Sequence, residues 1–186
     1  LAKLAVKINK TDEKLWLNLA ETQIANKLYK KALNSLNQAQ KINSNISEIY
    51  FAKSNIFFKI SQLKNAKTAL ETGLRIDPTN HNAIFQLGNI LLMEKNYPKA
   101  LELFDKSIKI KPNFWQAINN KGLAYFEQNK INLSIKFFEK ALSIQDNAEP
   151  MLGLASCLRT KDIKLALQLA KKALTKDPNY VNYNYR

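Results

Sequence analysis

Residues 81–114 read HNAIFQLGNILLMEKNYPKALELFDKSIKIKPNF, and this stretch decides the fold. In its first half, small and apolar residues recur three or four positions apart, the spacing of one helix face, at Ile84, Leu87, Gly88 and Leu91. After Glu94-Lys95-Asn96 a second set begins, with Ala100, Leu101, Phe104, Ser107 and Ile108. Pro98 fits the first turn of that second helix, where its missing N–H costs little. The stretch therefore predicts a helix, a turn and a second helix.

The same pattern recurs at an offset of 34 residues, which marks an internal repeat. Four columns of matched side-chain size carry it: Ala32, Ala66, Ala100 and Ser134; Leu36, Leu70, Phe104 and Phe138; Ala39, Gly73, Ser107 and Ala141; Ala20, Ser54, Gly88 and Gly122. The small residues predict close approach of two helices, and Leu36 and its equivalents are expected to fill the space between successive blocks. Proline disfavours helix in the residue before it, so Asp77-Pro78 and Lys111-Pro112 close their blocks.

These columns divide the chain into consecutive blocks. Residues 1–12 are expected to be the end of a preceding repeat, followed by full repeats at 13–46, 47–80, 81–114 and 115–148. A fifth repeat, 149–180, is two residues short, with the shortening expected in its central turn, and residues 181–186 are expected to start a following repeat. The chain begins at Leu1 rather than Met. Together with the half-repeats at its ends, this predicts a segment of a longer array that can self-associate through its open repeat ends.

These blocks resemble the tetratricopeptide repeat family, whose period is 34 residues. Block 81–114 carries the resemblance best, through Ile84, Leu87, Gly88, Leu91, Tyr97, Ala100, Phe104, Ser107 and Pro112. Other blocks depart from the pattern: Ser44 and Asp146 stand at the proline position, and Lys53 and Lys121 replace the leucine column. We expect these two lysines to be partly exposed. The resemblance implies an all-α chain, a right-handed α-solenoid of stacked helix–turn–helix repeats that serves many functions.

The resemblance also implies that the first helix of each block lines a concave groove. Positions two, five, six, nine, twelve and thirteen of each block face that groove, as the resemblance implies. The residues predicted to form the partner-binding groove come from positions five, six, nine and twelve: Leu17, Asn18, Glu21, Ile24, Phe51, Asn55, Phe58, Phe85, Gln86, Asn89, Leu92, Asn119, Asn120 and Phe126. Apolar side chains there would take the side chains of a peptide, and amides would pair with its backbone N–H and C=O groups. The alternative is that asparagine, at 22 residues, is common throughout the chain, and that Phe51 and Phe58 pack against neighbouring helices.

Chaperone-binding members of this family clamp a C-terminal carboxylate with Lys, Arg and Asn, as the resemblance implies. No register of the blocks supplies the cations, and the first three blocks place Leu17, Glu21, Ala52, Asn82 and Gln86 at those positions. Without cations the carboxylate would lose its charge-assisted hydrogen bonds. We therefore predict that a chaperone-type carboxylate clamp is absent.

The composition argues against an enzyme. Apolar residues make up 46% of the chain, enough for a folded core. One cysteine, Cys157, and one histidine, His81, exclude an internal disulfide framework, a Cys-rich zinc site and a multi-histidine metal site. The sequence also lacks a Gly-rich phosphate loop. We predict no catalytic residues, no cofactor and no metal site, with Cys157 as a small packing residue.

The chain is strongly basic, with 29 Lys and Arg against 15 Asp and Glu and a formal charge of +14. Lysine supplies 26 of the basic residues, and a surplus of Lys and Asn fits an A/T-rich coding bias as well as a function. Columns late in the second helices predict a basic convex edge made of Lys7, Lys41, Arg75, Lys106, Lys109, Lys140 and Lys172. This edge would suit an anionic membrane or nucleic acid. The interpretation that we favour is a solvated helix face with cations near helix C-termini.

Taken together, these features predict a non-catalytic protein–protein interaction module that binds an extended or helical segment of a protein partner in its groove. Two alternatives stay open: an assembly or scaffolding factor that uses the basic edge, and a repeat segment of a larger enzyme. The sequence contains no apolar run near the about 20 residues that span a bilayer. It also contains no visible secretory signal, and we expect a cytoplasmic protein; the start at Leu1 rather than Met leaves a preceding targeting segment as the alternative.

Overall fold

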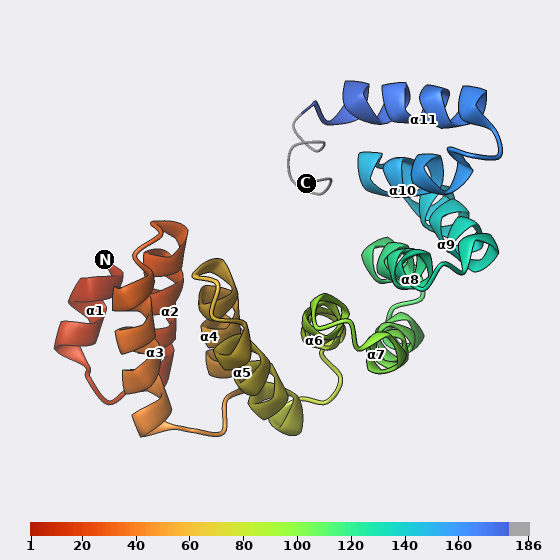
Figure 1. The fold of residues 1–186 in the computed structure, drawn as a ribbon. Coiled ribbons are helices and arrows are strands. Elements are labelled where there is room, and N and C mark those ends of the chain that lie inside the picture. Colours follow the sequence, from red (N-terminus) through yellow and green to blue (C-terminus); the bar gives the residue numbers. More distant parts are fainter. Residues whose placement is uncertain (179–186) are drawn as a thin grey trace. The chain divides into compact units, whose positions relative to one another are not determined.

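The computed structural model describes residues 1–178, and every regular element within them is an α-helix (Figure 1). The predicted all-α class is therefore confirmed. The expected start of a further repeat at 181–186 lies outside the described residues. The chain forms two compact units, Leu1–Ile90 and Leu91–Arg186, which are described separately below.

The helices come in pairs of similar length joined by short turns. The first unit holds α1 (Ala2–Ile8), α2 (Glu13–Ala25), α3 (Tyr29–Ile42), α4 (Ser47–Lys59), α5 (Leu63–Ile76) and most of α6 (His81–Met93). The second unit holds the end of α6, then α7 (Tyr97–Ile110), α8 (Trp115–Glu127), α9 (Ile131–Ile144), α10 (Ala148–Leu158) and α11 (Ile163–Lys176). Within the first unit α2 contacts α3 and α4, and within the second unit α8 contacts α9 and α10.

One turn geometry recurs between the first and second helix of a pair. The residues Lys27, Ser61, Lys95 and Asn129 lie 34 positions apart, and each has a left-handed backbone with φ between 58° and 60°. In the first of these turns, the N–H of Lys27 donates to Ile24 and the N–H of Leu28 donates to Gln23, at 2.9 and 2.8 Å. This pair of bonds satisfies carbonyls that the helix end would leave open, as in a Schellman motif. The turn therefore repeats with the sequence, although none of the four residues is glycine.

The fifth pair departs from this pattern, and our prediction of where it shortens is wrong. First helices such as α8 have 13 residues, whereas α10 has 11. The turn after α10 runs over residues 159–162, one residue longer than the turn at 128–130 after α8. The missing residues are therefore lost from the helix and not from the central turn. Asp162 caps the second helix instead, since its carboxylate accepts from the N–H of Leu165 at 3.0 Å.

Large side chains from the second helices fill the space between successive pairs, as the columns predict. Leu36, Leu70, Phe104 and Phe138 are all buried. Phe138 on α9 lies between two glycines, because a Cβ added at Gly122 or at Gly153 would come within 2.9 or 2.5 Å of its ring. The absence of side chains on α8 and α10 at these two points is what gives the ring its room.

Our prediction that Lys121 is partly exposed is wrong. It is only 7% exposed, although a lysine in the leucine column was expected to be partly exposed. Its Nζ lies 2.5 Å from Asp105 Oδ1 and 4.5 Å from the centre of the Phe137 ring. The aliphatic stem therefore fills the leucine site while the ammonium finds a carboxylate and an aromatic face. Lys53 is half-buried, as expected, and donates to Gln40 Oε1; its burial lowers its pKa.

Candidate functional site

The first unit contains a pocket where α2, α3 and α4 meet, here called the α2–α4 pocket. Its volume is about 260 Å³, and its lining consists of Lys14, Leu17, Asn18, Glu21, Leu36, Glu48 and Ala52. Four of these residues lie on α2, two on α4 and one on α3. Leu36 is buried, Leu17 and Ala52 are half-buried, and the polar residues are exposed. The pocket therefore has an apolar floor and a polar rim.

Two carboxylates, Glu21 and Glu48, lie on the rim of this pocket together with the ammonium of Lys14. Ser47 Oγ donates to Glu48 Oε2 at 3.1 Å. Among residues 1–178, no Lys or Arg nitrogen lies within 4.0 Å of the carboxylate of Glu21 or of Glu48. The two carboxylates therefore have no ion-pair partner in a unit that carries thirteen Lys and Arg against six Asp and Glu.

A second, apolar pocket adjoins the first and is here called the α1 pocket. Leu1, Ala2, Leu4, Ala5, Ile8, Leu15 and Asn18 line its volume of about 450 Å³. Asn18 belongs to both pockets, so the two surfaces are continuous across one side chain. Leu4 and Ile8 are 59% and 81% exposed, and on α11 Ile163 and Leu167 are 62% and 56% exposed. Self-association through these apolar faces stays a prediction.

In the first unit, most of the predicted groove residues reach solvent. Asn18, Glu21, Asn55, Phe58 and Gln86 are exposed, whereas Leu17, Ile24, Phe51, Phe85 and Asn89 are half-buried. Phe51 points at α5, because a Cβ added at Gly73 would lie 2.4 Å from its ring. Its packing against Gly73 agrees with the alternative raised from the sequence. The structure brings Leu17, Asn18 and Glu21 together in one pocket, and that pocket does not include the phenylalanines.

In the second unit, Asn119, which we predicted as a groove residue at the fifth position of its block, is buried and does not face solvent. Asn119 is 2% exposed, and its Nδ2 donates to Glu149 Oε1 at 2.9 Å and to Asn120 Oδ1 at 3.1 Å. The amide is thus covered and engaged by α10, because Glu149 stands in the first turn of that helix. Leu92, Asn120 and Phe126 are half-buried.

Four pocket residues were absent from our groove prediction: Lys14, Leu36, Glu48 and Ala52. Lys14 and Glu48 share one position, the second of their blocks, which also faces the groove in the family. The second position of the block could therefore have predicted Lys14 and Glu48 as pocket residues. Leu36 belongs to a core column, and nothing in the sequence pattern shows that one edge of it reaches the pocket.

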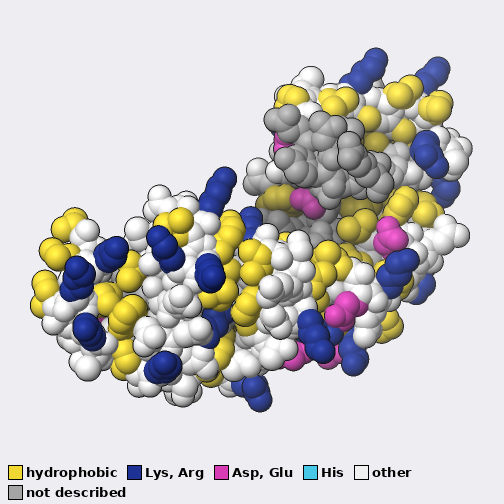
Figure 2. All heavy atoms as spheres, turned by 60° about the vertical axis from the view of Figure 1, so that its left-hand side comes forward, with side chains coloured by type: hydrophobic (Ala, Val, Ile, Leu, Met, Phe, Trp, Pro, Cys, Tyr) yellow, Lys and Arg dark blue, Asp and Glu magenta, His cyan; other side chains and the backbone are white. Residues whose placement is uncertain are grey.

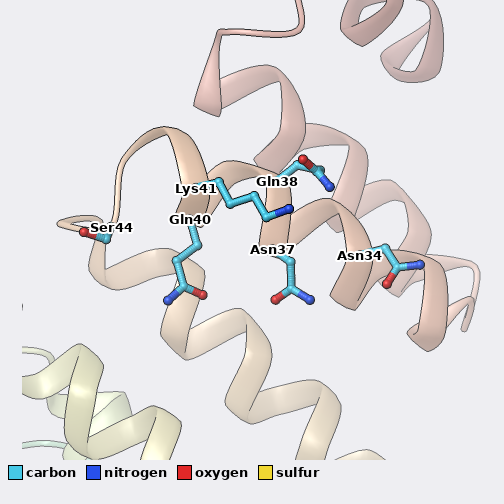
Figure 3. Close-up of a pocket in the computed structure, with 6 residues that line it drawn as sticks. All are labelled: Asn34, Asn37, Gln38, Gln40, Lys41 and Ser44. Carbon is cyan, nitrogen blue, oxygen red and sulfur yellow. The ribbon is translucent and has the colours of Figure 1, made fainter.

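The predicted basic edge lies on the second helices and on α1, and all of its residues are exposed: Lys7, Lys41, Arg75, Lys106, Lys109, Lys140 and Lys172. On the face drawn in Figure 2, Lys and Arg side chains are spread over the surface and are not gathered in one patch. Lys41 lies on α3 beside the amides Asn34, Asn37, Gln38 and Gln40, with Ser44 in the following loop (Figure 3). Asp146 accepts from Lys176 at 2.8 Å and lies 3.6 Å from Lys172.

The described residues hold no group of His, Cys, Asp and Glu side chains that could bind a metal ion. Within residues 1–178, no helix has the length and apolarity to cross a bilayer. Cys157 is buried against α9, and its Sγ lies 3.3 Å from Ser134 Oγ. Burial raises the pKa of the Cys157 thiol, because the thiolate would lose its hydration, and the hydrogen bond with Ser134 opposes this by a smaller amount.

We expect Cys157 to react slowly with iodoacetamide while the chain is folded. A raised pKa means less thiolate at any given pH, so the alkylation rate should rise only above the range of a free cysteine, about pH 8.5. At neutral pH the folded chain should react at least about tenfold more slowly than the chain in urea. Mass spectrometry of the alkylated thiol against time measures both rates. Equal rates would contradict the buried position of this thiol.

The helix pairs match one family of known proteins. A family model described as tetratricopeptide repeat matches residues 81–114, and a second model with the same description matches residues 13–46, 47–80 and 116–147. The chain belongs to the tetratricopeptide repeat family. Tetratricopeptide repeat proteins are helical-repeat solenoids and are generally modules for protein–protein interaction, which agrees with the fold predicted from the columns.

Two relatives share part of this repeat sequence. Sperm-associated antigen 1 of Rattus norvegicus is 34% identical over 80 residues, and that of Mus musculus is 35% identical over 80 residues. Each match spans 41% of this chain and 9% of the relative. The chain therefore corresponds to a small part of these proteins.

Solved structures share the fold along most of the chain. YrrB, described as a tetratricopeptide repeat protein with an unusual peptide-binding site, aligns with a TM-score of 0.76 at 19% identity, over 97% of this chain and 94% of YrrB. MamA aligns with a TM-score of 0.72 at 26% identity, over 78% of this chain and 85% of MamA. One chain of the Cut9–Hcn1 complex aligns with a TM-score of 0.82 at 16% identity. The alignment covers 97% of the present chain and 36% of the matched chain.

Proposed function

We propose that this tetratricopeptide repeat chain is a non-catalytic interaction module that holds an extended or helical segment of a partner protein against the first helices of its repeats. The observation that carries the proposal is the α2–α4 pocket, which has an apolar floor and a polar rim and includes three predicted groove residues, Leu17, Asn18 and Glu21. YrrB has the same fold and is described as having a peptide-binding site. That description belongs to YrrB and adds support by analogy only.

The pocket suits one apolar side chain of a bound segment. Leu17, Leu36 and Ala52 offer it an apolar surface, and a volume of about 260 Å³ accommodates a side chain but not a folded domain. The exposed amide of Asn18 carries both a donor and an acceptor, so it can pair with the backbone of the same segment.

The experiment that tests this proposal is a selection of peptides from a random phage-displayed library by the purified chain. Wild type should enrich peptides with apolar anchors, whereas a variant with a filled α2–α4 pocket, Ala52→Arg, should not enrich them. Enrichment of the same peptides by both proteins would overturn the proposal.

The wider role that we propose for such a module is that of a scaffolding or assembly factor in the cytoplasm. Fractionation of cells followed by detection of the protein tests the location. Recovery of the protein only outside the cytoplasmic fraction would contradict it.

A further inference from the structure

We propose that the α2–α4 pocket selects segments in which a Lys or Arg stands next to the apolar anchor residue. This inference rests on the proposed function and names the chemistry of the partner. Its basis is the pair of carboxylates on the rim, Glu21 from α2 and Glu48 from α4, which line the same pocket of about 260 Å³.

The charges of the pocket run opposite to those of the whole chain. The formal charge of the chain is +14, and lysines are spread over its surface. The rim of this pocket nevertheless carries two carboxylates and one ammonium, that of Lys14. One positive charge on the bound segment would leave the rim neutral. A segment with a carboxylate there would face Glu21 and Glu48 and would be repelled.

The two carboxylates are also available for a ligand. Both side chains are exposed, and neither has a Lys or Arg partner among residues 1–178. By contrast, two other acidic residues of the chain are engaged: Asp105 pairs with Lys121, and Asp146 pairs with Lys176. The Ser47 hydroxyl occupies one oxygen of Glu48 and leaves the second oxygen open to a guanidinium or an ammonium.

A bound segment interacts more strongly with the two carboxylates of the pocket rim than with the positive net charge of the whole chain. The net charge of the chain acts over long range and is screened over about 8 Å at physiological salt. A cation in the pocket would stand beside the residues that line it, Glu21 and Glu48 among them, at separations shorter than this screening length. The apolar floor formed by Leu17 and Ala52 takes the neighbouring anchor side chain, or the stem of the Lys or Arg itself.

The test uses a random phage-displayed dodecapeptide library in about 0.15 M salt, which limits unspecific attraction to the lysines. Wild type should enrich peptides in which Lys or Arg neighbours Leu, Ile, Phe or Met. The double variant E21Q/E48Q should lose the preference for a basic residue but keep the preference for an apolar one. A synthetic wild-type-selected peptide should bind the double variant about three- to tenfold more weakly.

A matched control separates local contact from net charge. Glu71→Gln and Glu139→Gln remove two carboxylates from exposed positions on the second helices α5 and α9. The control protein should bind the selected peptide as wild type does. An equal loss in the control and in E21Q/E48Q would overturn the inference.

Two further outcomes distinguish the inference from the proposed function. Peptides with apolar anchors but no basic preference would overturn the inference and leave the groove function standing. Failure to enrich any peptide, with the chain shown to be folded by circular dichroism, would overturn both.

Discussion

Replacing Phe138 with alanine is expected to lower the free energy of unfolding by about 3–5 kcal/mol. The ring is 2% exposed and fills the space between α8 and α10. Both glycines that face it lack side chains that could move into the cavity, so the helices themselves would have to shift to close it. Urea unfolding followed by circular dichroism at 222 nm measures this loss.

Phe137→Ala is the matched control, because it removes the same ring from the next position of α9. Phe137 is only half-buried, stacks on Tyr125 with ring centres 5.3 Å apart, and lies under the Lys121 ammonium. We expect this control to lose about 1 kcal/mol, the size of one aromatic contact. A larger loss for Phe137→Ala than for Phe138→Ala would show that the packing between repeats described above is wrong.

Ala52→Arg is expected to weaken the binding of a selected peptide by more than about a hundredfold, or roughly 2.7 kcal/mol. The new side chain would extend over Leu17 into the α2–α4 pocket and occupy the volume that the anchor side chain needs. Its guanidinium would stand four residues after Glu48 on α4, the spacing and order at which a carboxylate and a cation attract on a helix. The variant should therefore keep its fold and block its own pocket. Fluorescence anisotropy of the labelled peptide measures the loss.

Two further variants keep this result interpretable. Asn37→Arg adds the same charge at an exposed position of α3 (Figure 3), in a separate pocket that shares no residue with the α2–α4 pocket, and should bind as wild type does. Asn18→Arg places the bulk on an exposed residue of the pocket rim, so it tests the same idea where no buried contact is disturbed. Unchanged binding by both pocket variants would contradict the location of the site.

The fold was predictable because its signal is periodic. Leu36, Leu70, Phe104 and Phe138 recur at one offset and are all buried, and the glycines opposite Phe138 make room for its ring. A repeat also places the same turn at Lys27, Ser61, Lys95 and Asn129, where the residue types alone would not have indicated a left-handed backbone. Periodicity thus reports backbone geometry even where side-chain chemistry does not.

The site was less predictable because it depends on side-chain direction and on single neighbours. Asn119 occupies a groove position by count, but Glu149 from the next repeat engages and covers it. Lys121 breaks the leucine column and is nevertheless buried, because Asp105 and Phe137 receive its ammonium. In both cases the burial depends on contacts with individual neighbouring side chains that are not part of the repeat pattern. The repeat columns therefore could not predict it.

The central claim, that a partner segment lies over α2 and α4, is tested most directly by photo-crosslinking. A peptide selected by wild type, with benzoylphenylalanine in place of its apolar anchor, is irradiated with the full chain, and the adducts are located by mass spectrometry. The account predicts adducts on α2 and α4 in the segments that contain Leu17, Asn18 and Ala52. Adducts confined to second helices, such as the α3 surface around Asn37, would contradict it.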